Sequence, residues 1–199
     1  MELYYSQNSP FARIARVVAR ELDMIGLVEE VRAANRQPDN PVLLHSPVGR
    51  VPTLVDGDLV IAEAVNVVRY LEEILQPSRA GDERSPNWTN IMQEGLILGF
   101  MDGIACWVRE NRRPSEHRSA FLVKVEHDRS ERCLHRLEHE AGSGRLGDFP
   151  VYRFVALAAG LDLMEFHKFH EHWRMSHPAL ASWFEKQVLR QSMRETAPV

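Results

Sequence analysis

The sequence has few of the features that mark specialised protein classes. Only two cysteines occur in its 199 residues, Cys106 and Cys133, and they are far apart. A disulfide-stabilised secreted domain needs more cysteines in a shorter chain, so we interpret both as free thiols in a reducing compartment. Neither charge sign dominates, since the net charge is -4 and the pI is about 6.1. This balance argues against nucleic acid or an anionic membrane as the main partner.

Long hydrophobic runs are lacking as well. No uninterrupted apolar run approaches the ~20 residues that a membrane span needs. Residues 1–5 lack the basic start and the apolar stretch of a signal peptide. What remains is an ordinary globular composition, 44% hydrophobic and 26% charged. We therefore expect a cytoplasmic protein without a membrane partner.

Two kinds of periodicity divide the chain. The first part mixes strand and helix patterns, with strands expected at 2–5, 27–31, 51–55 and 59–61 and helices after Pro10 and over 63–75. After the polar stretch 77–86 the pattern is helical only, over 88–110, 115–140, 150–166 and 179–190. The sequence thus predicts an α/β domain over residues 1–77, followed by an all-helical domain over residues 86–199.

Ser9 directly precedes Pro10, a residue that suits the first position of a helix. A hydroxyl there lies among free backbone N–H groups, at the positive end of the helix dipole, where an anion is favoured. The simpler interpretation is a helix cap, because serine is a preferred cap residue. Taken alone, Ser9 leaves both interpretations open.

Two further motifs lie in the same domain. Pro52 begins a strand, where its missing N–H costs least, and the Val51–Pro52 bond is a candidate for cis geometry that turns the Val51 backbone toward a ligand. Glu63 and Ala64 start a helix directly after a strand. The Glu63 carboxylate either stabilises its own helix end or accepts a ligand ammonium group, while the Ala64 N–H meets a ligand carboxylate.

In this order, the segments 4–13, 49–55 and 62–72 resemble the glutathione S-transferases. The helical half is similar to bacterial members at residues 113–114, 118–119 and 177–184, so the resemblance covers nearly the whole chain. It implies a thioredoxin-like first domain that binds glutathione and a helical bundle that shapes the pocket for an electrophile. It also implies a homodimer with glutathione as co-substrate, a role in detoxification and no metal.

The resemblance also implies roles for individual residues. Ser9 falls where serine-type members place the hydroxyl that hydrogen-bonds the glutathione sulfur. Val51, before a cis Pro52, would pair through its backbone with the cysteinyl part, and Glu63 and Ala64 would hold the γ-glutamyl end. A serine hydroxyl is too weak an acid to be the nucleophile unaided, so its role is to donate a hydrogen bond to the thiolate. Ser6 is a second hydroxyl in the same loop, further from the helix start.

The sequence departs from the family pattern at three places. Ala64 stands where members usually carry a serine, so one hydroxyl contact to glutathione is missing. Pro150 and Arg153 replace the Ser/Thr and Asp of a reciprocal helix cap, for which Asp148 is the expected substitute. The first domain contains no cysteine, which argues against thiol–disulfide exchange. A non-catalytic binding or interaction protein with this fold is therefore the alternative function.

Three other features have plain structural interpretations. His167, His170 and His172 could place two ligands on one helix face, but a polar surface segment is the favoured reading, because no further ligand completes a metal site. The basic residues around Arg112 are expected at a solvated helix end. Most apolar residues of the helix 88–110 are expected in the core, although Met101 or Trp107 could face a hydrophobic substrate.

Overall fold

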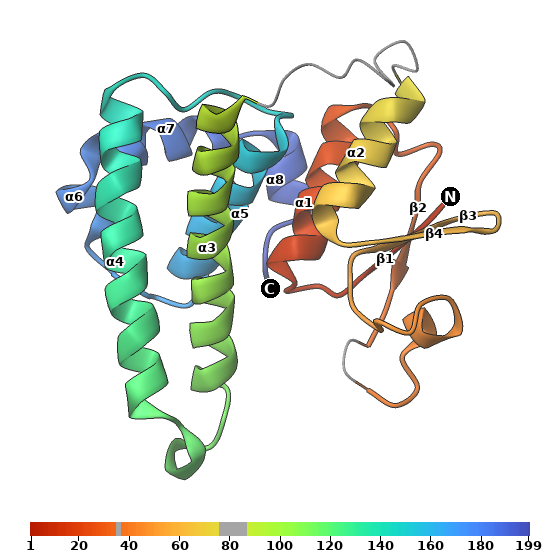
Figure 1. Cartoon of the computed structure of the whole chain (residues 1–199), viewed down its shortest axis with the longest axis horizontal. Helices are drawn as coiled ribbons and strands as arrows, with labels where there is room; N and C mark the ends of the chain where they lie inside the picture. Colours follow the sequence, from red (N-terminus) through yellow and green to blue (C-terminus); the bar gives the residue numbers. More distant parts are fainter. Residues whose placement is uncertain (35–36, 76–86) are drawn as a thin grey trace. The chain divides into compact units, whose positions relative to one another are not determined.

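The computed structural model describes residues 1–34, 37–75 and 87–199 (Figure 1). The chain folds into two compact units. Unit 1 comprises Met1–Pro86 together with Gln191–Val199, and unit 2 comprises Asn87–Arg190. The sequence predicts a helical domain over 86–199, whereas residues 191–199 pack with the α/β unit. The predicted start of that domain, residue 86, and the expected loop at 77–86 lie outside the described residues.

Unit 1 has a four-stranded sheet in the order β2-β1-β3-β4. β1 pairs with β2 in parallel and with β3 antiparallel, and β3 pairs antiparallel with β4. The elements are β1 (Glu2–Tyr5), α1 (Pro10–Glu21), β2 (Glu29–Arg32), a short 3-10 helix (Pro41–Leu44), β3 (Thr53–Asp56), β4 (Leu59–Ala62), α2 (Ala64–Leu75) and α8 (Gln191–Glu195). This mixed sheet with its helices confirms the predicted thioredoxin-like domain.

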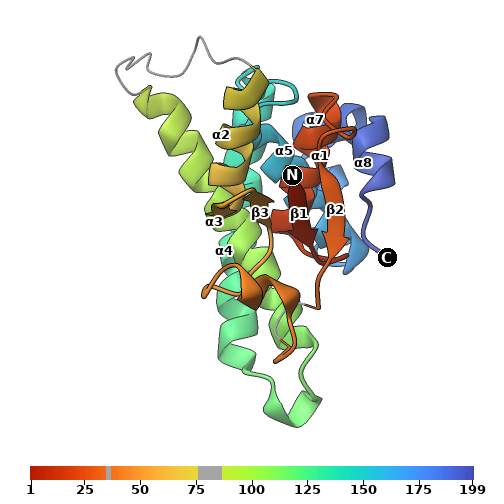
Figure 2. The ribbon, with the colours of Figure 1, turned by 90° about the vertical axis from the view of Figure 1, so that its right-hand side faces the viewer.

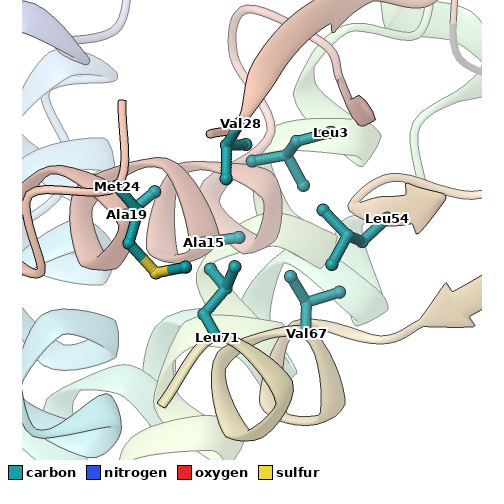
Figure 3. Packing of buried hydrophobic residues seen from close by; sticks show 8 residues of the cluster. All are labelled: Leu3, Ala15, Ala19, Met24, Val28, Leu54, Val67 and Leu71. Atoms are coloured by element: carbon teal, nitrogen blue, oxygen red, sulfur yellow. The ribbon is translucent and has the colours of Figure 1, made fainter. Parts of the chain in front are cut away.

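The core of unit 1 joins the sheet to α1 and α2 (Figure 3). Leu3 and Leu54 extend from neighbouring strands, and Ala15, Val67 and Leu71 meet them from the two helices. Alternate strand residues point to the same face, so one side of the sheet receives both helices. The expected hairpin at Asp56-Gly57 is confirmed, with Gly57 at φ 57, a value that glycine adopts without steric cost.

Unit 2 is helical throughout its regular structure, as predicted. Its elements are α3 (Trp88–Asn111), a 3-10 turn (Ser115–His117), α4 (Ala120–Gly142), α5 (Tyr152–Phe166), α6 (Trp173–Ser176) and α7 (Pro178–Val188). α3 packs against α4 and α5, and α5 is the buried helix that its apolar sequence predicts. α4 begins later than expected because Ser119 caps it, and Phe121, expected inward, is 78% exposed.

The prediction that Asp148 caps α5 is wrong. Val151 is the residue that precedes the helix, and no side chain caps it. Asp148 instead accepts a hydrogen bond from Gln187 Nε2 at 2.8 Å, which ties the preceding loop to α7. Arg153 donates through Nε to Gln93 Oε1 at 2.8 Å, so the start of α5 is fastened to α3 by side chains rather than by a cap.

α3 is, in the described part of the chain, the one helix long and apolar enough to cross a membrane. Length and composition are weak evidence, because the core helices of water-soluble proteins have the same character. In α3, 50% of the most apolar 18-residue stretch is buried inside the protein.

Candidate glutathione site

The sheet brings the three motifs of the α/β unit to one of its ends. Tyr4 of β1, Thr53 of β3 and Ala62 of β4 are paired in one row across three neighbouring strands. β1 and β4 run one way and β3 the other, so the chain leaves β1, enters β3 and leaves β4 at the same end of the sheet. Neighbouring strands lie about 4.8 Å apart. The loop after β1, the residues before β3 and the start of α2 are therefore close neighbours.

Ser9 is the N-cap of α1. Its Oγ accepts a hydrogen bond from the Ala12 backbone N–H at 3.2 Å, and its own N–H donates to the Ser6 carbonyl at 3.0 Å. The second bond closes the turn that leads out of β1. In the cap the hydroxyl acts as an acceptor, and the described residues offer no acceptor for its proton. One oxygen can therefore cap the helix and donate to a bound anion.

Val51 and Pro52 are joined by a cis peptide bond, the geometry for which this bond was a candidate. The Val51 side chain is buried with Tyr4, Ala12 and Val42. Because that side chain belongs to the core, only the Val51 backbone remains to meet a ligand. The Thr53 hydroxyl donates to the Arg50 carbonyl at 2.8 Å and fixes the entry into β3.

Glu63 has a left-handed backbone, with φ 71. This conformation is unfavourable for a residue with a Cβ atom, and such strain concentrates at ligand sites. The Glu63 carbonyl accepts from the Val67 N–H at 3.0 Å at the start of α2, while its side chain is exposed. Ala64 is 2% exposed. Its N–H belongs to the first turn of α2, where backbone donors have no partner within the helix.

The first domain also matches a known family model. Residues 3–79 match the model described as "Glutathione S-transferase, N-terminal domain". A glutathione S-transferase from Methylobacillus flagellatus, solved with glutathione bound, is 27% identical to the chain, with a TM-score of 0.84 over 100% of this chain and 99% of the other.

Residues 3–79 thus carry a glutathione S-transferase N-terminal domain, and the chain as a whole is similar to solved glutathione S-transferases.

Further solved structures share the fold of the chain. A family member from Pseudomonas fluorescens Pf-5 with bound glutathione is 24% identical, with a TM-score of 0.83 over 100% of this chain and 98% of the other. Gtt2 from Saccharomyces cerevisiae is 18% identical, with a TM-score of 0.81 over 98% and 100%. None of the curated proteins matches the chain.

The histidines after α5 do not form the helical pair that their spacing allows. The segment turns instead, with Lys168 and His170 both at positive φ. His170 bonds through Nε2 to the Ser130 Oγ at 2.8 Å, and the Ser130 hydroxyl donates to the His127 carbonyl at 2.8 Å. His170 Nε2 is therefore the donor to Ser130. His167 packs against the rings of Phe166 and Phe169.

A different group in α4 has the spacing of a metal site. One ligand atom from each of His127, Asp128 and Glu131 lies within 4.8 Å of the others. The Asp128 carboxylate already forms an ion pair with the Lys124 ammonium at 2.6 Å, and Glu131 is exposed. Such exposed groups are common without an ion, and we assign no function to this one.

The candidate substrate contacts on α3 are buried. Met101 is 0% exposed, and Trp107 is 8% exposed and stacked on Phe169 with ring centroids 3.9 Å apart. Both therefore serve the core of unit 2, as was expected for most apolar residues of this helix. Met92 of the same helix is an exception, at 57% exposure. Arg112 and Arg113 are exposed at the end of α3, as expected.

Sequence reasoning missed the partners of Asn8, the residue before Ser9. Its side chain donates through Nδ2 to the Val199 carbonyl at 2.7 Å and accepts from the Val199 N–H at 3.0 Å. The two residues are separated by almost the full length of the chain. No local pattern could have indicated the pair.

Proposed function

We propose that the protein conjugates glutathione to a hydrophobic electrophile and that Ser9 stabilises the glutathione thiolate. The observation that carries the proposal is the Ser9 hydroxyl that caps α1. It lies next to the sheet end where the Val51 and Glu63 segments converge. The 27% identical relative from Methylobacillus flagellatus has glutathione bound, which supports glutathione as the co-substrate here.

The energies available at Ser9 are sufficient for this role. A free thiol titrates near ~8.5, and lowering its pKa by about two units requires roughly 2.7 kcal/mol of preference for the anion. A hydrogen bond to a charged group supplies ~1.5–3 kcal/mol, and the helix end adds ~0.3–1 kcal/mol. Ser9 occupies the N-terminus of α1 and can provide both. The thiol proton passes to water, and the thiolate forms a C–S bond to the electrophilic carbon, either displacing a leaving group as an anion or adding to an activated double bond that then takes up a proton.

The remaining parts of glutathione would bind along the same end of the sheet. The Val51 backbone would pair with the cysteinyl part of the peptide. The exposed Glu63 carboxylate would accept a hydrogen bond from the γ-glutamyl ammonium group, and the Ala64 N–H would donate to the γ-glutamyl carboxylate of glutathione. The strained Glu63 backbone supports this arrangement, because a ligand site explains why the conformation is kept.

We further propose a cytoplasmic homodimer with a role in detoxification. The first turns of α3 carry Trp88, Ile91 and Met92 at 72%, 47% and 57% exposure. An exposed cluster of large apolar side chains favours a protein contact, and a second copy of the chain would supply it. A Pseudomonas fluorescens family member holds S-(propanoic acid)-glutathione, a glutathione carrying a substituent on sulfur, which supports conjugation as the reaction class.

The alternative is a binding or interaction protein that keeps the fold without efficient turnover. Ala64 favours it, because the hydroxyl that members usually place there is missing. Thermal unfolding with and without millimolar glutathione, followed by a conjugation assay on the wild type and on Ser9→Ala, separates the two functions. The proposal requires a higher melting temperature with glutathione, since a ligand of the native state stabilises it, and turnover that falls in Ser9→Ala. A shift without turnover favours the binding protein.

A further inference from the structure

The last nine residues of the chain lie along α1, within unit 1 (Figure 2). The Ser192 hydroxyl donates to Glu21 Oε1 at 2.5 Å, near the end of α1. Glu195 accepts from Arg20 Nε at 3.0 Å. These two contacts fasten the segment 191–199 to the part of α1 farthest from Ser9.

The middle of the segment is held by a buried arginine. Arg13, 4% exposed, donates through Nε to Thr196 Oγ1 at 3.3 Å and through Nη2 to the Met193 carbonyl at 3.0 Å. Thr196 and Met193 are 0% and 1% exposed. A guanidinium removed from water needs acceptors around it, so these bonds stabilise the docked segment. Arg13 lies one turn after Ser9, on the helix that Ser9 caps.

The end of the segment reaches the turn that carries Ser9. The Asn8 side chain binds both the carbonyl and the N–H of Val199, at 2.7 and 3.0 Å. Along the segment, the contacts thus run from Glu21 back to Asn8, the full length of α1. The turn between β1 and α1 is consequently held on one side by the Ser9 cap bond and on the other by Val199.

We propose that residues 191–199 position the Ser9 hydroxyl, with Asn8 and Arg13 as the positioning residues. The proposal rests on the function proposed above for Ser9. Asn8 and Arg13 act through Ser9, by holding the turn before it and the first turn of the helix behind it. A donor to a thiolate must be aligned to within a fraction of an ångström, so a loosened turn weakens the hydrogen bond without removing it.

The test compares Asn8→Ala with Arg194→Ala. Arg194 is an exposed residue of the same segment, so its replacement controls for general effects of changing α8. In Asn8→Ala we expect a higher pKa of the bound glutathione thiol and a kcat lowered about three- to tenfold. The affinity for S-methylglutathione, which has no ionisable thiol, should stay within about twofold, because the other proposed contacts come from Val51 before β3 and from Glu63 and Ala64 at the start of α2. Thr196→Val should move the same quantities in the same direction through Arg13.

Hydrogen exchange of the free protein provides a readout that does not depend on glutathione. The Ala12 amide is bonded to Ser9 Oγ, so a loosened turn exposes it. Its exchange should quicken about fivefold in Asn8→Ala, as for a lost cap, and stay unchanged in Arg194→Ala. Equal exchange and equal thiol pKa in both variants would overturn the positioning role. A wild-type protein that binds no glutathione would refute the proposed function instead, and the exchange rates would still decide whether the segment holds Ser9.

Discussion

Ser9 Oγ accepts a hydrogen bond from the Ala12 backbone N–H at 3.2 Å. The bond uses a lone pair of the oxygen, and the hydroxyl proton is directed elsewhere. Structural and chemical roles therefore meet in one atom, and a mutation that removes the hydroxyl changes both. Replacements that retain the cap and alter the chemistry can separate the two roles.

The first prediction separates the cap from the chemistry at Ser9. Ser9→Ala should lower the free energy of unfolding by about 1 kcal/mol and also reduce conjugation, since the cap and the donor are both lost. Ser9→Asp should stay within a few tenths of a kcal/mol of the wild type, because aspartate is an equally good cap. Its carboxylate would nevertheless repel the thiolate and reduce conjugation at least as much as alanine does. Urea unfolding and initial rates measure the two effects, and parallel losses of stability and rate in both variants would contradict the separation.

The second prediction uses the left-handed backbone of Glu63. Glu63→Gly should raise the free energy of unfolding by about 1 kcal/mol, because glycine adopts this φ without a Cβ clash. It should also weaken glutathione binding through loss of the carboxylate. Glu63→Gln is the matched control, which keeps the strain and loses only the charge. Titration calorimetry should show weaker glutathione binding for both variants. Unfolding measurements should show a higher free energy of unfolding for Glu63→Gly alone. Unchanged affinity in both would remove Glu63 from the site.

The third prediction restores the hydroxyl at position 64. Ala64→Ser should tighten glutathione binding by ~1–2 kcal/mol, about tenfold, through a contact to the γ-glutamyl carboxylate. Because Ala64 is 2% exposed, a hydroxyl that misses the ligand would be buried without a partner and would lower the melting temperature of the free protein. Ala62→Ser, at the end of β4, is the control. Calorimetry without any tightening for Ala64→Ser would count against this placement of the ligand.

The fourth prediction concerns pH and unit 2. Burial, with a further contribution from His127, lowers the pKa of His170 below its ordinary value of 6.5. The unfolded chain therefore binds this proton at a higher pH than the native protein. The contribution of neutral His170 to the free energy of unfolding is fully present above about pH 6.5. It decreases as the pH falls through the pKa of His170 in the unfolded chain and then through its lower pKa in the native protein. Glu131 acts in the opposite direction, and His177 adds to the lowering.

His170→Asn tests this pH dependence. The variant should show a smaller loss of melting temperature than the wild type between about pH 8 and 5. Part of the loss should remain, because burial and Arg112 also lower the pKa of His167. His172→Asn changes an exposed histidine of the same turn and should behave as the wild type does. A wild-type pH profile in His170→Asn would show that His170 is not the group responsible.

Much of unit 1 could be predicted because its signals are local. Asp56-Gly57 determines a hairpin through two residues, and Ser9-Pro10 starts a helix through two more. The end of the sheet at which the motifs meet follows from strand order, which the resemblance implied. The left-handed backbone of Glu63 had no sequence signal, because a glutamate gives no sign of positive φ.

The errors arose where distant partners decide the structure. Aspartate is a common cap residue, yet the Asp148 carboxylate accepts a hydrogen bond from Gln187 of α7 instead of capping α5. The sequence predicts a helix from residue 115, whereas Ser119 caps α4 and the helix begins at Ala120. The predicted helical domain over 86–199 includes the segment 191–199. Its buried contacts with Arg13 place it on α1 instead, and no local pattern specifies them.

The pKa of the glutathione thiol in the bound state tests the central claim most directly. It can be followed through the ultraviolet absorbance of the thiolate as the pH is raised, in the wild type and in Ser9→Ala. The wild type should show a thiol pKa about two units below the free value near ~8.5, and Ser9→Ala should return it by at least about one unit. An equal thiol pKa in the two proteins would contradict the claim that Ser9 stabilises the thiolate.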